Sequence, residues 1–252
     1  MSYTISVDTG GTFTDVIVTD ASGAMTIGKS LTTPDRIFDG MRAAITSAAD
    51  LLSLSFDQLL TGTGMLIYGT TRATNAIVTK TVAKTAFVTT EGFADILLLK
   101  EGGKFNPHDF SQDYPDPFIP RRWTFEVRER MSSEGTASIP FDEESARAVA
   151  QAIREHGFEA VAVSFLWSIA NPAHELKFAE ILAEVAPGLP FTLSHQLNPV
   201  VREYRRASAT AIDASLKPLM QQHLRGLERD LAAAGFTGEL LISTTAGGCN
   251  FL

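Results

Sequence analysis

The residues best suited to chemistry lie near the start of the chain. The segment from Asp8 to Asp15 runs Asp-Thr-Gly-Gly-Thr-Phe-Thr-Asp. Gly10 and Gly11 carry no side chains, so the backbone N–H groups of a tight turn there can close on a phosphate oxygen. β-Rich residues flank the glycines on both sides, which predicts strand–turn–strand. A dinucleotide fingerprint or a Walker loop needs a helix after its glycines, and both are therefore excluded.

The other polar residues of this segment would supply oxygen ligands. Asp8, at the end of the first strand, suits Mg²⁺, usually through water, and Asp15 either does the same or only orients the loop. Because side chains alternate along a strand, Thr12 and Thr14 are expected to share one face while Phe13 enters the core. Thr9 completes the set of candidate binding residues. An ordinary hairpin turn is the competing interpretation.

A second polar cluster follows a short apolar strand. Gly69 ends the strand, and Thr70 and Thr71 precede a predicted helix. Their hydroxyl and N–H groups would receive a phosphoryl oxygen or a substrate carbonyl, with Thr71 the catalytic member, while Asn75 caps the helix or contacts the ligand. Ligands gather at the carboxyl ends of strands, so we expect Thr71 and Thr12 to line one pocket. Helix capping by the threonines is the alternative.

A third group of candidates lies near residue 200. His195 is a candidate proton shuttle near neutral pH, or a structural hydrogen-bonding residue. The planar fork of Arg202 suits a phosphate or carboxylate. Glu203 and Arg206 are spaced as an i, i+3 ion pair on a helix. The remaining histidines and Cys249 show no metal-ligand spacing.

The elements that must position these residues begin with three short strands. Residues 3–7, 12–19 and 25–31 predict an antiparallel meander, and a helix starts after Thr33. Residues 100–122 are predicted to form a long ordered loop rather than a linker. Its aromatic side chains are expected to be buried; these are Phe105, Phe110, Tyr114 and Phe118.

From about residue 142 onward helices and strands alternate, which favours a largely parallel sheet. Asn198 and Pro199 predict the cap and first position of a long helix that ends near Ala234 and bends near Pro218.

Composition narrows the functional class. The 252 residues carry a net charge of −8, which argues against nucleic acid and anionic membranes as partners. No run of about 20 apolar residues and no signal peptide is present, and the single cysteine fits a reducing compartment, so a cytoplasmic protein is expected.

Together the motifs resemble a known family. The segment from Asp8 to Asp15 looks like the first phosphate loop of the actin, sugar kinase and chaperone ATPase superfamily. Within that group it resembles hydantoinase A and 5-oxoprolinase. Further segments of the family's pattern are Tyr68 to Ala76, Ser194 to Pro199 with Arg202 to Arg206 and Ser208 to Thr210, and Thr244 to Gly248.

The resemblance implies an α/β fold: a ribonuclease H-like lobe with an opening antiparallel meander and a mixed sheet flanked by helices. It also implies ATP and Mg²⁺ as cofactors, a hydantoinase B-type subunit or domain as partner, and an oligomer. Residues 1–190 would be the N-terminal domain and residues 191–252 the start of the core domain. The family pattern continues beyond Leu252, so residues 1–252 are expected to be a fragment, a truncated gene product or the ordered part of something larger.

The activity implied is ATP-dependent opening of a cyclic amide, such as a hydantoin or 5-oxoproline, through a phosphorylated substrate. A subunit of an ATP-dependent ketone carboxylase, of the acetone or acetophenone type, is the first alternative. A non-catalytic binding fragment is the second.

Overall fold

The computed structural model describes residues 2–102, 104, 106, 108–244 and 247–251, and it contains two compact units. Unit 1 combines Met1–Thr81 with Met220–Leu252, and unit 2 is the intervening segment Val82–Leu219. The boundary at residue 190 was predicted from the family resemblance, whereas these two units are distinguished by their compactness in space. The boundary at residue 190 therefore stays a prediction. The chain passes between the units after Thr81 and again after Leu219, one residue beyond Pro218.

Unit 1 is built on a six-stranded mixed sheet with the order β12-β11-β4-β1-β2-β3. The strands are β1 (Tyr3–Thr9), β2 (Phe13–Thr19), β3 (Met25–Leu31), β4 (Thr63–Thr70), β11 (Glu239–Ser243) and β12 (Cys249–Phe251). β2 is antiparallel to both β1 and β3, whereas β4 and β11 follow β1 in parallel. The predicted meander and the ribonuclease H-like layer are therefore confirmed.

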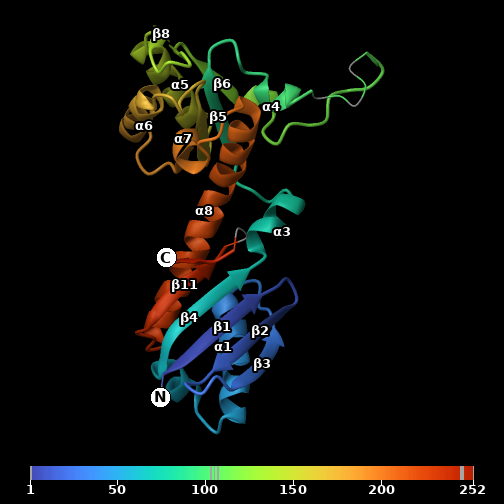
Figure 1. Ribbon diagram of the computed structural model, residues 1–252, viewed down its shortest axis with the longest axis vertical. Coiled ribbons are helices and arrows are strands. Elements are labelled where there is room, and N and C mark those ends of the chain that lie inside the picture. Colours follow the sequence, from blue (N-terminus) through green and yellow to red (C-terminus); the bar gives the residue numbers. More distant parts are fainter. Residues whose placement is uncertain (1, 103, 105, 107, 245–246, 252) are drawn as a thin grey trace. The chain divides into compact units, whose positions relative to one another are not determined.

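One face of this sheet carries the core of unit 1. Strand alternation turns Ile5, Val7, Leu66 and Tyr68 to that face. They pack against α1 (Ile37–Leu51), α2 (Phe56–Thr61) and the C-terminal part of α8 (Glu203–Ala233). Figure 1 shows α1 behind the sheet. A Cβ on Gly28 would collide with the backbone of α1, so this glycine permits the close approach of helix and strand.

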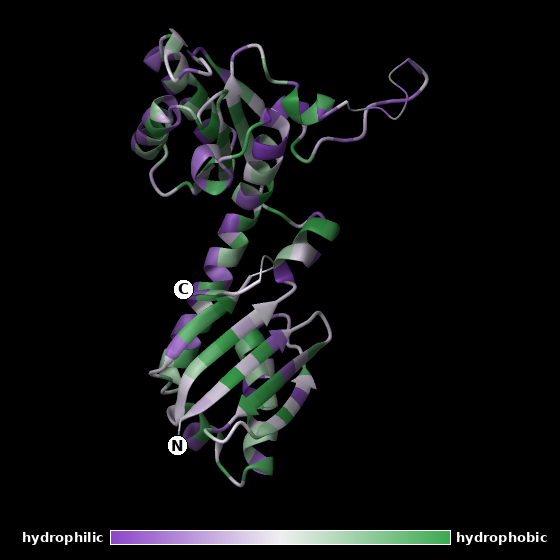
Figure 2. Ribbon diagram, in the orientation of Figure 1, coloured by the Kyte–Doolittle hydropathy of each residue, from purple (hydrophilic) through white to green (hydrophobic). Residues whose placement is uncertain are grey.

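Unit 2 has a four-stranded sheet in which all neighbours are parallel. In spatial order its strands are β10 (Phe191–Leu193), β9 (Ala160–Ser164), β5 (Thr85–Thr90) and β6 (Thr124–Val127). Its other elements are α4 (Ile96–Leu99), η1 (Arg121–Trp123), α5 (Glu143–Glu155), α6 (Ala173–Val185), α7 (Ser194–Leu197) and the hairpin of β7 (Arg130–Met131) and β8 (Ala137–Ile139). β9 is fully buried, and Figure 2 shows apolar residues concentrated in the strands.

Two sequence predictions about unit 2 are wrong. Phe110 is 90% exposed, so the excursion after α4 does not bury its aromatics as a group, although Phe118 packs against the core; Phe105 lies outside the described residues. The long helix begins at Glu203 rather than at Pro199. Asn198 instead follows the short helix α7.

Helix α3 (Arg72–Val78) follows β4 in unit 1. In the part of the chain that the structure describes, none of the helices combines the length and hydropathy needed to span a bilayer.

Candidate functional site

The two threonine-and-glycine motifs lie on neighbouring strands of unit 1. β1 and β4 run in parallel, with Asp8 beside Gly69 and Thr9 beside Thr70. The N–H of Thr71 donates to the carbonyl oxygen of Thr9 at 3.3 Å. Both motifs therefore sit at the carboxyl edge of one sheet, where ligands commonly bind in α/β folds.

The first motif forms the predicted hairpin turn. β1 ends at Thr9, β2 begins at Phe13, and the N–H of Gly10 donates to the Phe13 carbonyl at 3.0 Å. Neither glycine has a left-handed φ, so the turn does not need glycine for its backbone angles. A Cβ on Gly11 would lie 3.6 Å from Asn75 Nδ2. Gly11 is therefore a close neighbour of Asn75 in the second motif.

Asp8 and Asp15 are cross-strand partners on the sheet face opposite the core. Lys29 Nζ lies 2.6 Å from Asp15 Oδ1, and both side chains are about half exposed. Asp8 is exposed, and a Cβ on Gly69 would lie 3.8 Å from its Oδ1, so Gly69 leaves room beside this carboxylate. Of the two, Asp8 is the one without a cation bound to it among the described residues.

The expected orientation of residues 12–14 is wrong. Phe13 is 44% exposed, with Lys29 Nζ 4.6 Å from its ring centroid, whereas Thr14 is fully buried on the core face. The Thr14 hydroxyl bonds to the Thr32 hydroxyl at 3.0 Å. The reason is register: Thr14 pairs with Thr9, whose side chain is on the core face. Thr12 lies exposed in the turn.

The second motif does not use Thr71 as a helix cap. Thr71 is the residue before α3, but its side chain makes no capping hydrogen bond. Its hydroxyl instead accepts a long hydrogen bond, 3.4 Å, from Asn75 Nδ2. Thr70 Oγ1 accepts from the N–H of Arg72 at 3.2 Å, so Thr70 is the threonine that stabilises this turn.

Arg72 is a residue at this edge that the sequence interpretation missed. Arg72 Nε and Thr9 Oγ1 are buried polar atoms that have no hydrogen-bond partner within the described residues. Buried polar groups are normally paired, so two atoms of this kind are unusual within the described chain. The sequence held a signal: an arginine at the first position of a helix opposes the helix dipole and needs another reason to be there.

Tyr68 and His223 form a second pair that sequence reasoning missed. The Tyr68 hydroxyl lies 2.8 Å from His223 Nε2, and Tyr68 is fully buried. Burial, and then the nearby charge of Arg72, lowers the pKa of His223 to about 4. Burial also raises the pKa of Tyr68. Both rings are therefore neutral at physiological pH, and no spacing in the sequence links positions 68 and 223.

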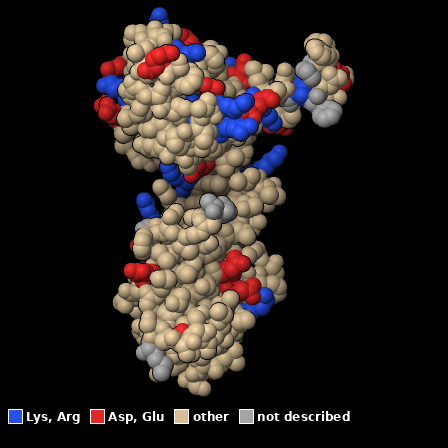
Figure 3. Space-filling model, in the orientation of Figure 1, with Lys and Arg blue, Asp and Glu red and all other residues tan. Residues whose placement is uncertain are grey.

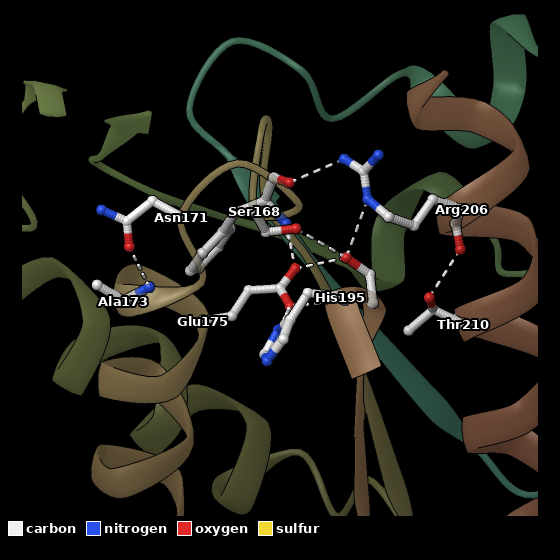
Figure 4. A network of polar contacts seen from close by, with 9 residues as sticks. Ser168, Asn171, Ala173, Glu175, His195, Arg206 and Thr210 are labelled. Atoms are coloured by element: carbon white, nitrogen blue, oxygen red, sulfur yellow. Dashed lines mark hydrogen bonds and ion pairs between the residues drawn. The ribbon is translucent and has the colours of Figure 1, made fainter. Parts of the chain in front are cut away.

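The other candidates, His195 and Arg202, belong to unit 2. His195 Nδ1 lies 2.6 Å from Glu175 Oε2, and Glu175 is completely buried. Glu175 also accepts from the Ser194 hydroxyl at 2.5 Å and from the N–H of Phe165 at 2.9 Å. Figure 4 shows Glu175 at the centre of this network. The Glu175 contacts fix the ring of His195, which fits the structural alternative for this residue as well as the catalytic one.

Arg206 extends the same network and is 1% exposed. It donates to Ser194 Oγ at 3.1 Å, to the Phe165 carbonyl at 3.1 Å and to the Val200 carbonyl at 3.0 Å. No ion pair with Glu203 forms among the described residues, so the expected surface pair is wrong: Arg206 faces inward. Arg202 has a 69% exposed side chain and lies 3.9 Å from Glu101.

A second buried carboxylate lies in the same unit. Glu129 bonds to the Thr90 hydroxyl and, at 2.7 Å, to His174 Nδ1. Burial raises the pKa of the Glu129 carboxyl, and the two hydrogen bonds oppose that shift. No sequence pattern points to Glu129, because it lies in a short segment between β6 and β7.

Charge is unevenly distributed on the visible surface. On unit 2 basic and acidic side chains are interspersed, whereas much of the visible surface of unit 1 is uncharged (Figure 3). A local group of acidic and basic side chains interrupts that surface. Such a pattern offers no continuous basic stripe on the face shown, in accord with the net charge of −8.

Comparisons with known proteins show what this chain is similar to. The family model described as hydantoinase/oxoprolinase N-terminal region matches residues 4–186. The chain is 32% identical to the caprolactamase subunit alpha of Pseudomonas jessenii, over 90% of this chain and 33% of that protein. It is also 32% identical to the acetophenone carboxylase gamma subunit of Aromatoleum aromaticum, over 97% of this chain and 35% of that protein.

A solved structure extends the likeness to three dimensions. The crystal structure of the ATP-dependent caprolactamase from Pseudomonas jessenii superimposes with a TM-score of 0.88 and 30% identity, covering 98% of this chain and 36% of that one. The chain thus spans about a third of the length of the relatives it matches. It belongs to the hydantoinase/oxoprolinase N-terminal region family.

Proposed function

We propose that this chain forms the nucleotide-handling part of an ATP-dependent enzyme that activates the carbonyl oxygen of a cyclic amide for ring opening. The observation that carries the proposal is the edge of unit 1, where the glycine hairpin adjoins Asn75 and where two buried polar atoms have no hydrogen-bond partner among the described residues. The similarity to an ATP-dependent caprolactamase supports it.

The residues at this edge fit a magnesium nucleotide. Mg²⁺ takes one or two carboxylates and fills its other positions with water and phosphate oxygens, and Asp8 with Asp15 offers such a donor set. Arg72 Nε would donate to a phosphate oxygen and so gain the hydrogen-bond partner that it lacks within the described residues. When bound, Mg²⁺ would supply charge neutralisation for the transferred phosphoryl group.

Each residue then has a defined task. Gly10 and Gly11 place no side chain between the turn and the phosphates, and Thr12, exposed in the turn, would donate its hydroxyl. Thr71 and Asn75 orient the carbonyl oxygen of the substrate beside the phosphates. Phosphoryl transfer to that oxygen releases ADP. Water then adds to the carbonyl carbon, the C–N bond breaks, and the nitrogen takes up a proton to leave as the amine. A second water hydrolyses the resulting acyl phosphate to the carboxylate and phosphate.

A ketone carboxylase subunit is the second candidate. The carboxylase relative is as similar to this chain as the caprolactamase subunit, at 32% identity each. In that reaction the same edge would serve phosphoryl transfer to a ketone-derived oxygen or to bicarbonate. Both relatives are named as subunits, which supports a multi-subunit enzyme with a B-type partner here.

The deciding experiment is an ATPase assay on the full-length protein with its partner subunit. We expect hydrolysis stimulated by hydantoins, lactams or 5-oxoproline, and stoichiometric ring-opened product. If ATP hydrolysis is stimulated only by a ketone together with bicarbonate, the protein is a ketone carboxylase subunit instead. Absence of ATP binding by calorimetry, in protein shown to be folded, would leave only a non-catalytic role.

A further inference from the structure

A pocket in unit 2 lies at the carboxyl ends of its parallel strands. Its volume is about 400 Å³, within the range of small-molecule sites. The chain leaving β5 leads to β6 on one side, and the chain leaving β9 leads through α6 to β10 on the other. The point between β5 and β9 is therefore a topological switch point, where α/β sheets bind ligands.

The walls of the pocket come from the segments that leave these strands. Phe93 and Ile96 follow β5, Arg130 follows β6, Leu166 and Trp167 follow β9, and the start of α8 closes the remaining side. Ligand pockets in α/β proteins are typically assembled in this way, from several loops on a rigid sheet.

The lining combines aromatic surface with positive charge. Phe93, Trp167 and Tyr204 provide ring surface, and Arg130 and Arg202 provide guanidinium groups. Arg130 lies over Phe93, 4.7 Å from the ring centroid, and makes no ion pair within the described chain. Planar guanidinium groups match the geometry of a carboxylate.

The two acidic residues of the lining offset only part of this charge, although Glu101 lies 3.9 Å from Arg202. Glu101 is held by Arg205, with bonds of 3.0 and 3.1 Å, and its pKa is lowered by that contact. Glu203 is the one carboxylate of the lining that no cation of the described chain neutralises. Lys100 adds a third cation to the pocket. Three cations and two carboxylates leave the lining with one positive charge in excess, which favours a single negative charge on the ligand.

The backbone around the pocket is strained and rigidly supported. Lys100, Trp167 and Arg202 have φ values of 55°, 56° and 83°, and they are three of the five non-glycine residues with left-handed φ in the described chain. Such residues persist where surrounding contacts over-determine them, and they concentrate at ligand sites.

The support comes from the buried network. The N–H of Leu166 donates to Thr90 Oγ1 at 3.0 Å, and Arg206 ties the Phe165 carbonyl to that of Val200. Those two carbonyls belong to the segments that carry Trp167 and Arg202. The wall positions are therefore set before any ligand arrives.

We propose that unit 2 holds its own binding site for a small organic carboxylate with an apolar or aromatic body. The ring would lie among Phe93, Trp167 and Tyr204, and the carboxylate would face Arg130 and Arg202. Binding at this site requires no nucleotide, so its test is independent of the function proposed for the edge of unit 1.

The test uses 4-fluorophenylacetate as probe and its neutral isostere, 4-fluorophenylacetamide, observed by ¹⁹F NMR without nucleotide. We expect saturable binding of the carboxylate below about 10 mM and binding of the amide that is about tenfold weaker. Arg202→Gln should weaken carboxylate binding by about tenfold, because a charged hydrogen-bond donor is lost. The matched control is Arg147→Gln, which alters an exposed ion pair on α5 and should leave binding unchanged.

A second readout places the probe within unit 2. The chain has two tryptophans, and Trp167 lines the pocket. Probe-dependent fluorescence change should persist in Trp123→Phe and disappear in Trp167→Phe. Equal affinity for acid and amide, no saturable binding below about 10 mM, or full retention of binding in an Arg130→Gln/Arg202→Gln double variant with native circular dichroism would overturn the proposal.

Discussion

At the scale of single residues, Asp8 is the carboxylate that matters most for the proposed activity. Its side chain is exposed and accepts no hydrogen bond from the described residues, so the fold does not depend on it. If it positions Mg²⁺, Asp8→Asn should reduce ATP turnover of the full-length protein by about 10²-fold or more. The control is Asp50→Asn, at an exposed position of α1. Unchanged turnover in folded Asp8→Asn protein would reduce this residue to a turn-former.

Thr70 and Thr71 form a matched pair with opposite expected effects. The Thr70 hydroxyl accepts a backbone hydrogen bond, so Thr70→Ala should lower stability by about 1 kcal/mol. Thr71 caps nothing, so Thr71→Ala should leave the melting temperature nearly unchanged and depress substrate-stimulated ATP hydrolysis. Calorimetry and ATPase assays on both variants check this. A destabilised Thr71→Ala protein with normal turnover would contradict the catalytic role. That Thr12 and Thr71 line one pocket stays a prediction.

At the scale of elements, the contact between β4 and α8 should make unit 1 sensitive to acid. The pKa of His223 falls from 6.5 to about 4 in the folded chain, so between these values the unfolded chain binds the proton more readily. The free energy of unfolding should therefore decrease as the pH drops from about 6.5 towards 4. Below pH 4, protonation of His223 should change it no further. Urea denaturation across this range measures the effect.

The control for this pH dependence is His223→Gln, which should flatten the profile between pH 6.5 and 4. A second check uses Arg72, whose charge contributes to the shift: Arg72→Gln should raise the pKa of His223, followed by NMR titration. A His223 pKa near 6.5 in the native protein would refute the assignment of a buried, neutral ring.

Arg206 joins β9, α7 and α8 within unit 2. Removing one member of a buried charged network leaves the other uncompensated, so Arg206→Met should destabilise the fold by about 3 kcal/mol. Arg205→Met, which removes a surface pair next to it, should have little effect. Hydrogen exchange should locate the loss of protection in Ala160–Ser164 and Ser194–Leu197. If amide hydrogen exchange in these segments is equally slow in both variants, Arg206 does not stabilise them.

At the scale of the whole molecule, the sequence predicted regular elements well and side-chain directions poorly. Strong periodic signals gave the meander, the buried strand β9 and the end of α8. Phe13 was placed in the core because it is apolar, but cross-strand register decides its face, and register depends on residues far along the chain.

Tertiary contacts explain the other misses. Pro199 is a good first residue for a helix, yet Arg206 bonds to the carbonyl of Val200 and holds that segment outside α8. Arg72 and His223 became visible only through burial and proximity, which local patterns do not encode. The edge of unit 1 was predictable, because glycines and threonines at strand ends carry a local signal.

The insertion of unit 2 between β4 and β11 fixes the order in which a ribosome can complete the fold. β11 pairs with β4, but residues 82–219 are synthesised between them. At about 5–20 residues per second, those roughly 140 residues take from several seconds to about half a minute. During that interval β4 is an open edge on a partly built sheet, exposed to pairing with other nascent chains. Unit 2 is synthesised later, but it is one continuous segment and can fold before unit 1 is complete. Chaperones that shield strand edges would therefore act on β4, in the part of the chain that is synthesised first.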